Sequence, residues 1–123
     1  MAETTYDPST DWHADRTRPV VYCVQSWFHP TDGGPYLKWL EDKHMAEVLA
    51  EPGMLQARRV VLDQTDENGW WCCLLIYDLE NRGALDAYLE SPARDKFWSE
   101  LEAFGNIHYS ERFWGEVDFR IFK

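Results

Sequence analysis

The chain has 123 residues, of which 45% are hydrophobic and 15% aromatic, and a formal net charge of −10 at pH 7. The negative charge argues against a nucleic-acid partner, because a nucleic-acid binder neutralises phosphates with Lys and Arg side chains. It also gives no attraction to anionic lipid, and the longest apolar runs fall far short of the ~20 residues that a membrane span requires. These features predict a soluble protein of one domain whose partner is neither nucleic acid nor a membrane.

The beginning of the chain differs in character from the rest. Residues 1–18 lack hydrophobic periodicity, contain turn formers and have no apolar run typical of a signal peptide. We therefore expect a flexible N-terminal arm at 1–18, or one that becomes ordered on a partner, with one domain at 19–123 and a cytoplasmic location. Three cysteines fit a reducing compartment, and we expect them to be buried as small hydrophobes: Cys23, Cys72 and Cys73.

A strand followed by a helix is predicted at the start of the domain. Residues 20–28 are β-branched and aromatic, as is typical of a strand, and alternation places Tyr22, Val24 and Ser26 on one side. Residues 35–50 then place apolar side chains at i, i+3 and i+4 steps before a Pro-Gly pair ends the helix.

Two further strands, a broken helix and a last strand follow. Residues 55–62 and 70–77 are strand-like and are joined by a polar segment that ends in Asn-Gly, which indicates a hairpin. Residues 82–104 show helical periodicity interrupted at Ser91, which can cap a new helix with the following Pro at its first position. Residues 109–122 alternate between two sides and predict a strand.

The resulting order, βαββαβ, is that of the ferredoxin-like split βαβ unit, an α+β fold with a four-stranded antiparallel sheet and both helices on one face. The other face is left bare. The last strand is expected to place Trp114 and Arg120 on its more polar side, a composition that favours a partner over water. A second copy of the chain is the simplest cover, so we expect a homodimer that forms a dimeric α/β barrel.

Several short sequence segments between residues 19 and 123 occur in a characteristic order. They are Trp39, His44-Met45, Pro52-Gly53-Met54, Ala57-Arg58-Arg59, the strand from Leu75 to Leu79, and Ala87-Tyr88-Leu89. With them the chain resembles the dimeric α/β-barrel superfamily, in which two ferredoxin-like subunits pack sheet against sheet. Its members include polyketide cyclases, muconolactone-type isomerases, cofactor-free monooxygenases and haem-dependent enzymes, so the fold alone does not select a function.

His44 is the leading candidate for a catalytic residue. It lies at helical spacing from Leu37, Leu40 and Val48, so a titratable ring is expected on a face that otherwise belongs to the core. In many members of the superfamily a helix-borne histidine lines a pocket between the sheet and the helices, and the resemblance implies this role for His44. There it would act as a general acid or base. The alternative is a core histidine hydrogen-bonded to a backbone carbonyl or a carboxylate.

Two arginines in the second strand are candidates for binding a substrate anion. Arg58 and Arg59 are adjacent, so they point to opposite faces and one of them is expected to face the helices. A guanidinium there could clamp a carboxylate or enolate, with Arg59 counted as catalytic and Arg58 as substrate-binding. The alternative is ion pairing with the plentiful acids. For Arg112 and Arg120 we expect a salt network across the dimer.

Aromatic residues complete the candidate site. Tyr22 and Tyr77 lie in strands expected to be central, where a phenol could donate to a developing oxyanion or simply fill the core. Four tryptophans could form an aromatic box around a flat substrate, although such residues are more often core: Trp27, Trp39, Trp71 and Trp98.

No metal or cofactor is expected. The four histidines have no ligand spacing, and no glycine-rich phosphate loop or nucleophile elbow is present in the sequence. The sequence and the resemblance together predict a cofactor-independent enzyme that moves a proton on a small, planar, anionic oxo or carboxylate compound of aromatic catabolism or polyketide type, by isomerisation, tautomerisation or cyclisation. The alternatives are a cofactor-free monooxygenase acting on a phenol, and a non-catalytic ligand-binding or stress-response module.

Overall fold

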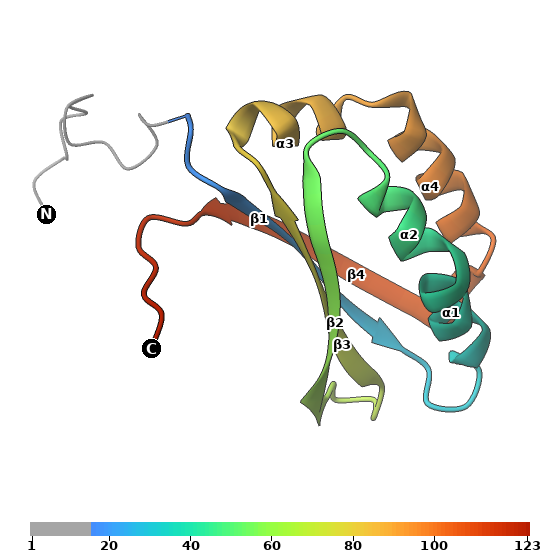
Figure 1. The fold of residues 1–123 in the computed structure, drawn as a ribbon. Helices are drawn as coiled ribbons and strands as arrows, with labels where there is room; N and C mark the ends of the chain where they lie inside the picture. Colours follow the sequence, from blue (N-terminus) through green and yellow to red (C-terminus); the bar gives the residue numbers. More distant parts are fainter. Residues whose placement is uncertain (1–15) are drawn as a thin grey trace, which may run out of the picture.

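The computed structural model describes residues 16–123, so nearly all of the expected N-terminal arm lies outside the described residues. The elements occur in this order: β1 (Val20–Phe28), α1 (Gly34–Trp39), a π-helical turn η1 (Leu40–His44), α2 (Met45–Leu49), β2 (Met54–Thr65), β3 (Trp71–Leu79), α3 (Arg82–Leu89), α4 (Pro92–Glu102), a 3₁₀ turn η2 (Gly105–Ile107) and β4 (His108–Glu116). The helices cover one face of the sheet (Figure 1). This arrangement confirms the predicted ferredoxin-like fold.

The sheet has four strands in the order β2-β3-β1-β4, and each neighbouring pair is antiparallel. Strand β1 is therefore central, and its residue Tyr22 lies opposite Tyr77 of β3 and Trp114 of β4. The predicted alternation along β1 is confirmed, because Tyr22, Val24 and Ser26 are at most 6% exposed and face the helices. These register positions decide which side chains can meet beneath the helices.

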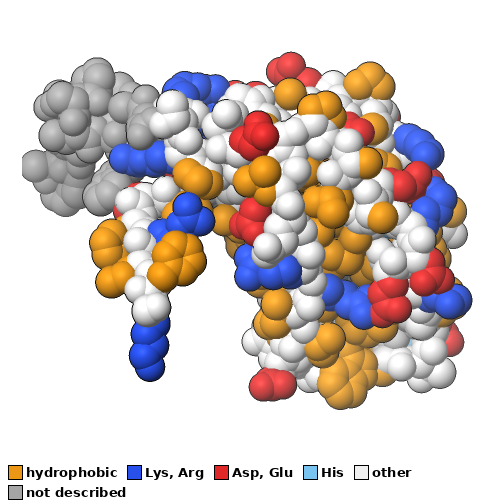
Figure 2. Space-filling model, viewed as in Figure 1, with side chains coloured by type: hydrophobic (Ala, Val, Ile, Leu, Met, Phe, Trp, Pro, Cys, Tyr) orange, Lys and Arg blue, Asp and Glu red, His pale blue; other side chains and the backbone are white. Residues whose placement is uncertain are grey.

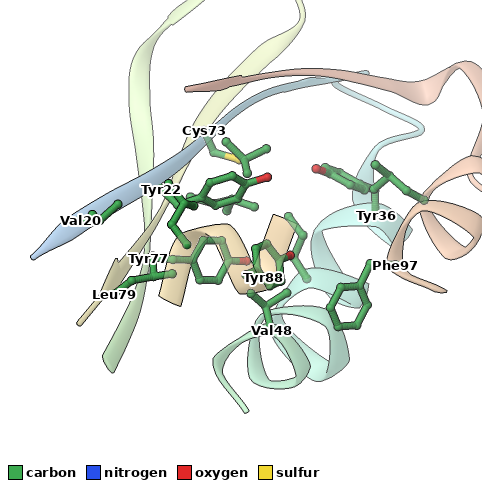
Figure 3. Close-up of a cluster of buried hydrophobic side chains, with 14 of the residues drawn as sticks. Val20, Tyr22, Tyr36, Val48, Cys73, Tyr77, Leu79, Tyr88 and Phe97 are labelled. Carbon is green, nitrogen blue, oxygen red and sulfur yellow. The ribbon is translucent and has the colours of Figure 1, made fainter. Parts of the chain in front are cut away.

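The core fills the space between the sheet and the helices. Figure 3 shows its ring systems and aliphatic side chains converging from both layers. Leu79 and Leu85 are completely buried, and burying a side chain of this size stabilises the folded state by roughly 1.5–3 kcal/mol. All three cysteines are free and buried, as expected, and burial raises the pKa of the Cys73 thiol to about 11.

Local signals place the second pair of helices. The Asn81 side chain accepts a hydrogen bond from the Ala84 amide and caps α3. Ser91 accepts from the Ala93 amide with a proline at the first helical position, which confirms the predicted break between α3 and α4. Gly53 has φ of +84°, and a Cβ there would lie 2.4 Å from the Cβ of Ala84, so this turn requires glycine.

The hairpin between β2 and β3 is confirmed, although its boundaries differ from the prediction. Strand β2 continues to Thr65, which pairs with Trp71 after an irregularity in the register. The turn itself is closed by Asp66, whose carboxylate accepts from the Asn68 and Trp70 amides. The polar residues Asp63 and Gln64 lie within the irregularity of β2, at an exposed hairpin end that tolerates polar side chains.

The last strand is shorter than predicted. Strand β4 ends at Glu116, and the Val117 amide then donates to the carbonyl of Pro19, just before β1 begins. Beyond this point no strand formed by residues 16–123 lies beside β4, so the alternating sequence has no ladder to join among them. Figure 2 shows hydrophobic side chains along this C-terminal segment, which stands away from the domain, and its large apolar residues are 76–81% exposed: Phe119, Ile121 and Phe122.

The two sides of β4 are also the reverse of the prediction. Trp114 and Arg112 lie opposite Tyr22 and Val24 and therefore share the helix-covered face, and the Trp114 ring stacks on Tyr22 with centroids 5.9 Å apart. The polar side of the strand is thus directed at the helices rather than at a partner. The bare face carries apolar residues instead, each of which is 41–48% exposed to solvent: Val60, Tyr109 and Phe113.

Candidate functional site

A π-helical turn carries His44. Residues 34–49 form one continuous helical segment in which the Met45 amide donates to the carbonyl of Leu40, five residues earlier. Leu40 and Val48 are at most 1% exposed, so the predicted apolar stripe exists and His44 lies along it. Single π turns within α-helices occur frequently at functional sites, which makes this segment a candidate on local grounds alone.

The His44 ring is held between aromatic side chains. It stacks on Trp39 with centroids 4.3 Å apart and contacts Phe97 edge to face at 5.0 Å. Its Nδ1 is buried and has no hydrogen-bond partner among the described residues. Nδ1 therefore lacks the hydrogen bond to a carbonyl or carboxylate that the alternative, a core histidine, would make.

Burial controls the charge of His44. Desolvation lowers the pKa of the ring from 6.5 to about 4, and the nearby carboxylates of Glu100 and Glu47 oppose this shift only in part. The ring is therefore neutral at pH 7. A neutral imidazole can accept a proton at one nitrogen, so His44 is suited to act as a base at neutral pH rather than as an acid.

A small cavity between the sheet and the helices brings the candidate residues together. Its volume is about 30 Å³, and it is lined by Tyr22, Val24, His44, Val48, Tyr77, Tyr88, Arg94, Phe97, Trp98, Leu101 and Arg112. A space of this size has room for roughly two water molecules. An organic ligand can therefore enter only if some of these side chains move.

Three tyrosines line the cavity from the sheet and from α3 (Figure 3). Tyr22 lies 6.2 Å from Tyr77 and 5.6 Å from Tyr88 between ring centroids. Burial raises the pKa values of Tyr77 and Tyr88 well above that of a free phenol, so both are neutral hydrogen-bond donors. The Tyr77 hydroxyl is buried without a partner among the described residues, so it is available to a group inside the cavity.

Two arginines supply positive charge to the same cavity. Arg112 comes from the helix-covered face of β4, and its guanidinium carbon lies 4.4 Å from the centroid of the Trp98 ring. Arg94 comes from α4 and also donates to the carbonyl of Leu89 at 3.4 Å. Guanidinium groups beside a neutral histidine and neutral phenols favour a bound anion.

Sequence reasoning missed Arg94, Arg112 and Tyr88 as lining residues. The sequence predicts a salt network across the dimer for Arg112, but the register of β4 directs it under the helices. The sequence contains a signal for Arg94, because helical spacing places it on the same face as three apolar residues. These follow it at i+3, i+4 and i+7: Phe97, Trp98 and Leu101. For Arg112 no local signal exists, since either face of a two-sided strand can meet the helices.

The two arginines predicted from β2 are placed away from the cavity. Arg59 does face the helices, but it donates to the carbonyl of Leu37 at 3.3 Å and pairs with Glu41. Arg58 lies on the bare face, 3.5 Å from Asp78. Both arginines therefore pair with acidic residues, which was the alternative to substrate binding, and neither lines the cavity with His44.

The four predicted tryptophans are divided in the same way. Trp98 lines the cavity and Trp39 stacks on His44. Trp27 stacks on Tyr109 on the bare face, and Trp71 is 47% exposed where β3 begins. The structure thus places two tryptophans at the site and does not form the expected box of four.

Residues 16–123 contain no group of three or more His, Cys, Asp or Glu side chains arranged to hold a metal ion. Over the same residues, no helix is long and apolar enough to cross a lipid bilayer.

Comparison with known proteins yields structural neighbours only. No protein-family model and no curated protein matches the sequence. A dimeric ferredoxin-like protein from an uncultured marine organism superposes with a TM-score of 0.66 and 11% identity, over 85% of this chain and 99% of that one. A monooxygenase from the gene ActVA-Orf6 of Streptomyces coelicolor, in complex with nanaomycin D, gives a TM-score of 0.64 and 11% identity over 92% and 99%.

A third neighbour is SnoaB, a cofactor-independent oxygenase from Streptomyces nogalater, with a TM-score of 0.58 and 15% identity over 85% of this chain and 97% of that one. At these identities the likeness concerns the fold. The chain has the ferredoxin-like fold of these proteins, and the neighbours span almost its whole domain.

Proposed function

We propose that the chain is a cofactor-independent enzyme that removes a proton from a small planar phenolic or enolic compound and stabilises the resulting anion. One observation carries the proposal: neutral His44, whose Nδ1 is buried without a partner among the described residues, and Arg112 line the same cavity. A base and a fixed positive charge beneath the helices, where burial shields both groups from much of the water, are what this reaction requires.

Each polar group has a part in this proposal. His44 accepts the proton, and its low pKa rises as negative charge develops on the neighbouring substrate. Arg112 pairs with the oxyanion, while Tyr77 and Tyr22 donate hydrogen bonds to it. Return of the proton to a different atom of the substrate completes an isomerisation, tautomerisation or cyclisation, with no net change in electrons and with His44 restored.

A second function, cofactor-free oxygenation, is favoured by the neighbours. ActVA-Orf6 is described as a monooxygenase and SnoaB as a cofactor-independent oxygenase. Here the same substrate anion would be oxidised by molecular oxygen, one oxygen atom entering the product and the other leaving as water with two substrate hydrogens. Deprotonation by His44 is common to both functions, but only the oxygenation consumes molecular oxygen. Oxygen uptake therefore distinguishes them.

We also propose that the chain is a homodimer assembled through the bare face of the sheet. Exposed apolar residues lie there, and Phe113 is 48% and Tyr109 44% exposed. The marine neighbour is described as a dimeric ferredoxin-like protein. Covering such side chains with a second copy removes apolar area from water, which is the main driving force for association.

Hydrogen–deuterium exchange tests the shared step. Purified protein is incubated in deuterium oxide with hydroxynaphthoquinones and unsaturated lactones, exchange at enolisable carbons is followed by NMR, and oxygen uptake is recorded in parallel. We expect faster exchange with wild-type protein than with His44→Gln, and no loss with His29→Gln, whose imidazole does not line the cavity and accepts hydrogen bonds from the backbone amides of Thr31 and Asp32. Exchange at the background rate for every compound, together with tight binding, would instead support the non-catalytic module.

A further inference from the structure

The cavity that contains His44 is adjacent to a hollow on the surface. The hollow has a volume of about 290 Å³ and is lined by Trp98, Leu101, Glu102, Gly105, Asn106 and His108. Trp98 and Leu101 line both spaces, and Trp98 is 40% exposed whereas Leu101 is 8% exposed. The Trp98 ring therefore belongs to a wall that separates the inner cavity from the hollow.

Size shows that the inner cavity cannot be a whole substrate site. Its volume is about 30 Å³, whereas pockets that hold small organic ligands have volumes of roughly 300–1,000 Å³. The hollow, at about 290 Å³, approaches this range by itself. A planar compound that reaches His44 must displace part of the lining, and the half-exposed Trp98 has more freedom to move than the buried residues around it.

Polar atoms without partners occur on both sides of Trp98. In the inner cavity these are the Tyr77 hydroxyl, on a residue that is 1% exposed, and Nδ1 of His44. At the hollow, Nε2 of His108 lies 3.1 Å from the carbonyl of Leu101 and donates to it, so Nδ1 is an acceptor. This Nδ1 is buried and has no partner among the described residues. A ligand hydroxyl that reached this nitrogen would donate to it, whereas an oxyanion in the inner cavity would accept from the Tyr77 hydroxyl.

A second hollow offers a less suitable extension. It has a volume of about 480 Å³ and meets the inner cavity at Tyr88, but its lining includes the carboxylates of Glu51 and Glu90 and no cationic side chain. The hollow beside Trp98 also lacks a cationic side chain but has one carboxylate, Glu102, so the second hollow, with two, repels an anion more strongly. Tyr88 is also only 6% exposed and packs edge to face on Tyr22, so it is held more firmly than Trp98.

We propose that the substrate site extends from the inner cavity past Trp98 into the hollow beside His108, and that Trp98 determines how large a planar anion the protein accepts. This inference rests on the proposed function, since it assumes that the anion binds beside Arg112. The Arg112 guanidinium lies against the Trp98 ring, so displacement of the ring also frees the guanidinium to meet the ligand.

A size series of ligands tests the inference. Dissociation constants of salicylate, with one ring, and 3-hydroxy-2-naphthoate, with two, are measured by calorimetry for wild-type protein and for variants at the wall and in the hollow. We expect Trp98→Ala to improve the affinity for the naphthoate relative to salicylate by about tenfold, with Trp98→Phe intermediate. Asn106→Trp, which fills the hollow from an exposed turn, should weaken naphthoate binding and leave salicylate unchanged.

The control is Trp71→Ala, which removes another exposed tryptophan that lines neither space and should leave the ratio unchanged. The inference is wrong if the ratio of the naphthoate and salicylate dissociation constants is the same in wild type, Trp98→Ala and Asn106→Trp. If Arg112→Gln still weakens salicylate binding in that case, the proposed anion site stands. Salicylate binding that Arg112→Gln does not weaken, or no binding of either compound, overturns the proposed anion site and the inference with it. Thermal denaturation of each variant establishes that it is folded.

Discussion

The two faces of the sheet contain the same kinds of residue but use them differently. On the helix-covered face, Arg112 lines a cavity with neutral tyrosines and His44. On the bare face, Arg58 pairs with Asp78 near solvent. Beneath the helices, burial changes pKa values and leaves polar atoms without partners, as at His44 and Tyr77. The same comparison yields pairs of variants whose effects should differ between the faces.

The largest effect is expected at His44. Replacement by glutamine keeps a polar side chain of similar size but removes the base, so proton exchange or turnover should fall by roughly 10²–10⁴-fold. The matched variant His29→Gln changes a histidine outside the cavity and should retain full activity. An equal loss in both variants, measured by initial rates, would contradict the assignment of His44 as the base.

Acid should destabilise the protein through His44. The folded-state pKa is about 4 and the unfolded value 6.5, so the unfolded chain binds the proton first as the pH falls. The contribution of His44 to stability is therefore complete above pH 6.5 and is lost progressively toward pH 4, by up to about 3 kcal/mol at about 1.4 kcal/mol per pKa unit.

Urea denaturation from pH 4 to 7 measures this loss. His44→Phe should show a flatter dependence on pH than the wild type. Burial also lowers the pKa of His108, so some dependence should persist in that variant. Parallel curves for wild type and His44→Phe would show that the folded protein does not hold His44 in its neutral form.

The arginines on the two faces provide the next comparison. Arg112→Gln removes the charge that pairs with a bound anion and should weaken salicylate binding by about thirtyfold, which corresponds to about 2 kcal/mol. Arg58→Gln removes a guanidinium that is 51% exposed in its side chain, and it should leave the dissociation constant unchanged. The two constants are compared by calorimetry at equal ionic strength, and a similar weakening in both variants would indicate a general charge effect.

Assembly should depend on the bare face only. Phe113→Asp places a charge on the proposed interface and should shift the protein from dimer to monomer at micromolar concentration. Val61→Asp alters a more exposed residue, at 60%, on the other side of the sheet and should leave the assembly unchanged. Light scattering after size exclusion gives the mass of each variant, and a wild-type monomer would refute the dimer.

The smallest effect concerns two buried hydroxyl groups beneath the helices. Tyr77→Phe removes a hydroxyl that has no partner, so stability should stay constant or increase by up to about 1 kcal/mol. Tyr36→Phe breaks a hydrogen bond of 2.7 Å with Ser26 and should destabilise the protein by about 1 kcal/mol. Equal changes in urea midpoints would show that the Tyr77 hydroxyl does have a partner in solution.

Much of the fold was predictable because its signals are local. The alternation in β1, the apolar stripe that includes His44 and the cap at Ser91 each depend on neighbours within one element, and each is confirmed. The placement of His44 in a cavity follows from that stripe together with the resemblance to a known superfamily.

The sequence by itself thus determined the order of the elements and the position of His44 on a buried helix face, because hydrophobic periodicity and capping act over a few residues. Only the tertiary structure decided that Arg112 rather than Arg59 lines the cavity, and that β4 ends at Glu116. Both outcomes depend on which strand lies beside which and in what register. A strand with two polar sides does not specify that register locally, since its side chains alternate with a period of two residues.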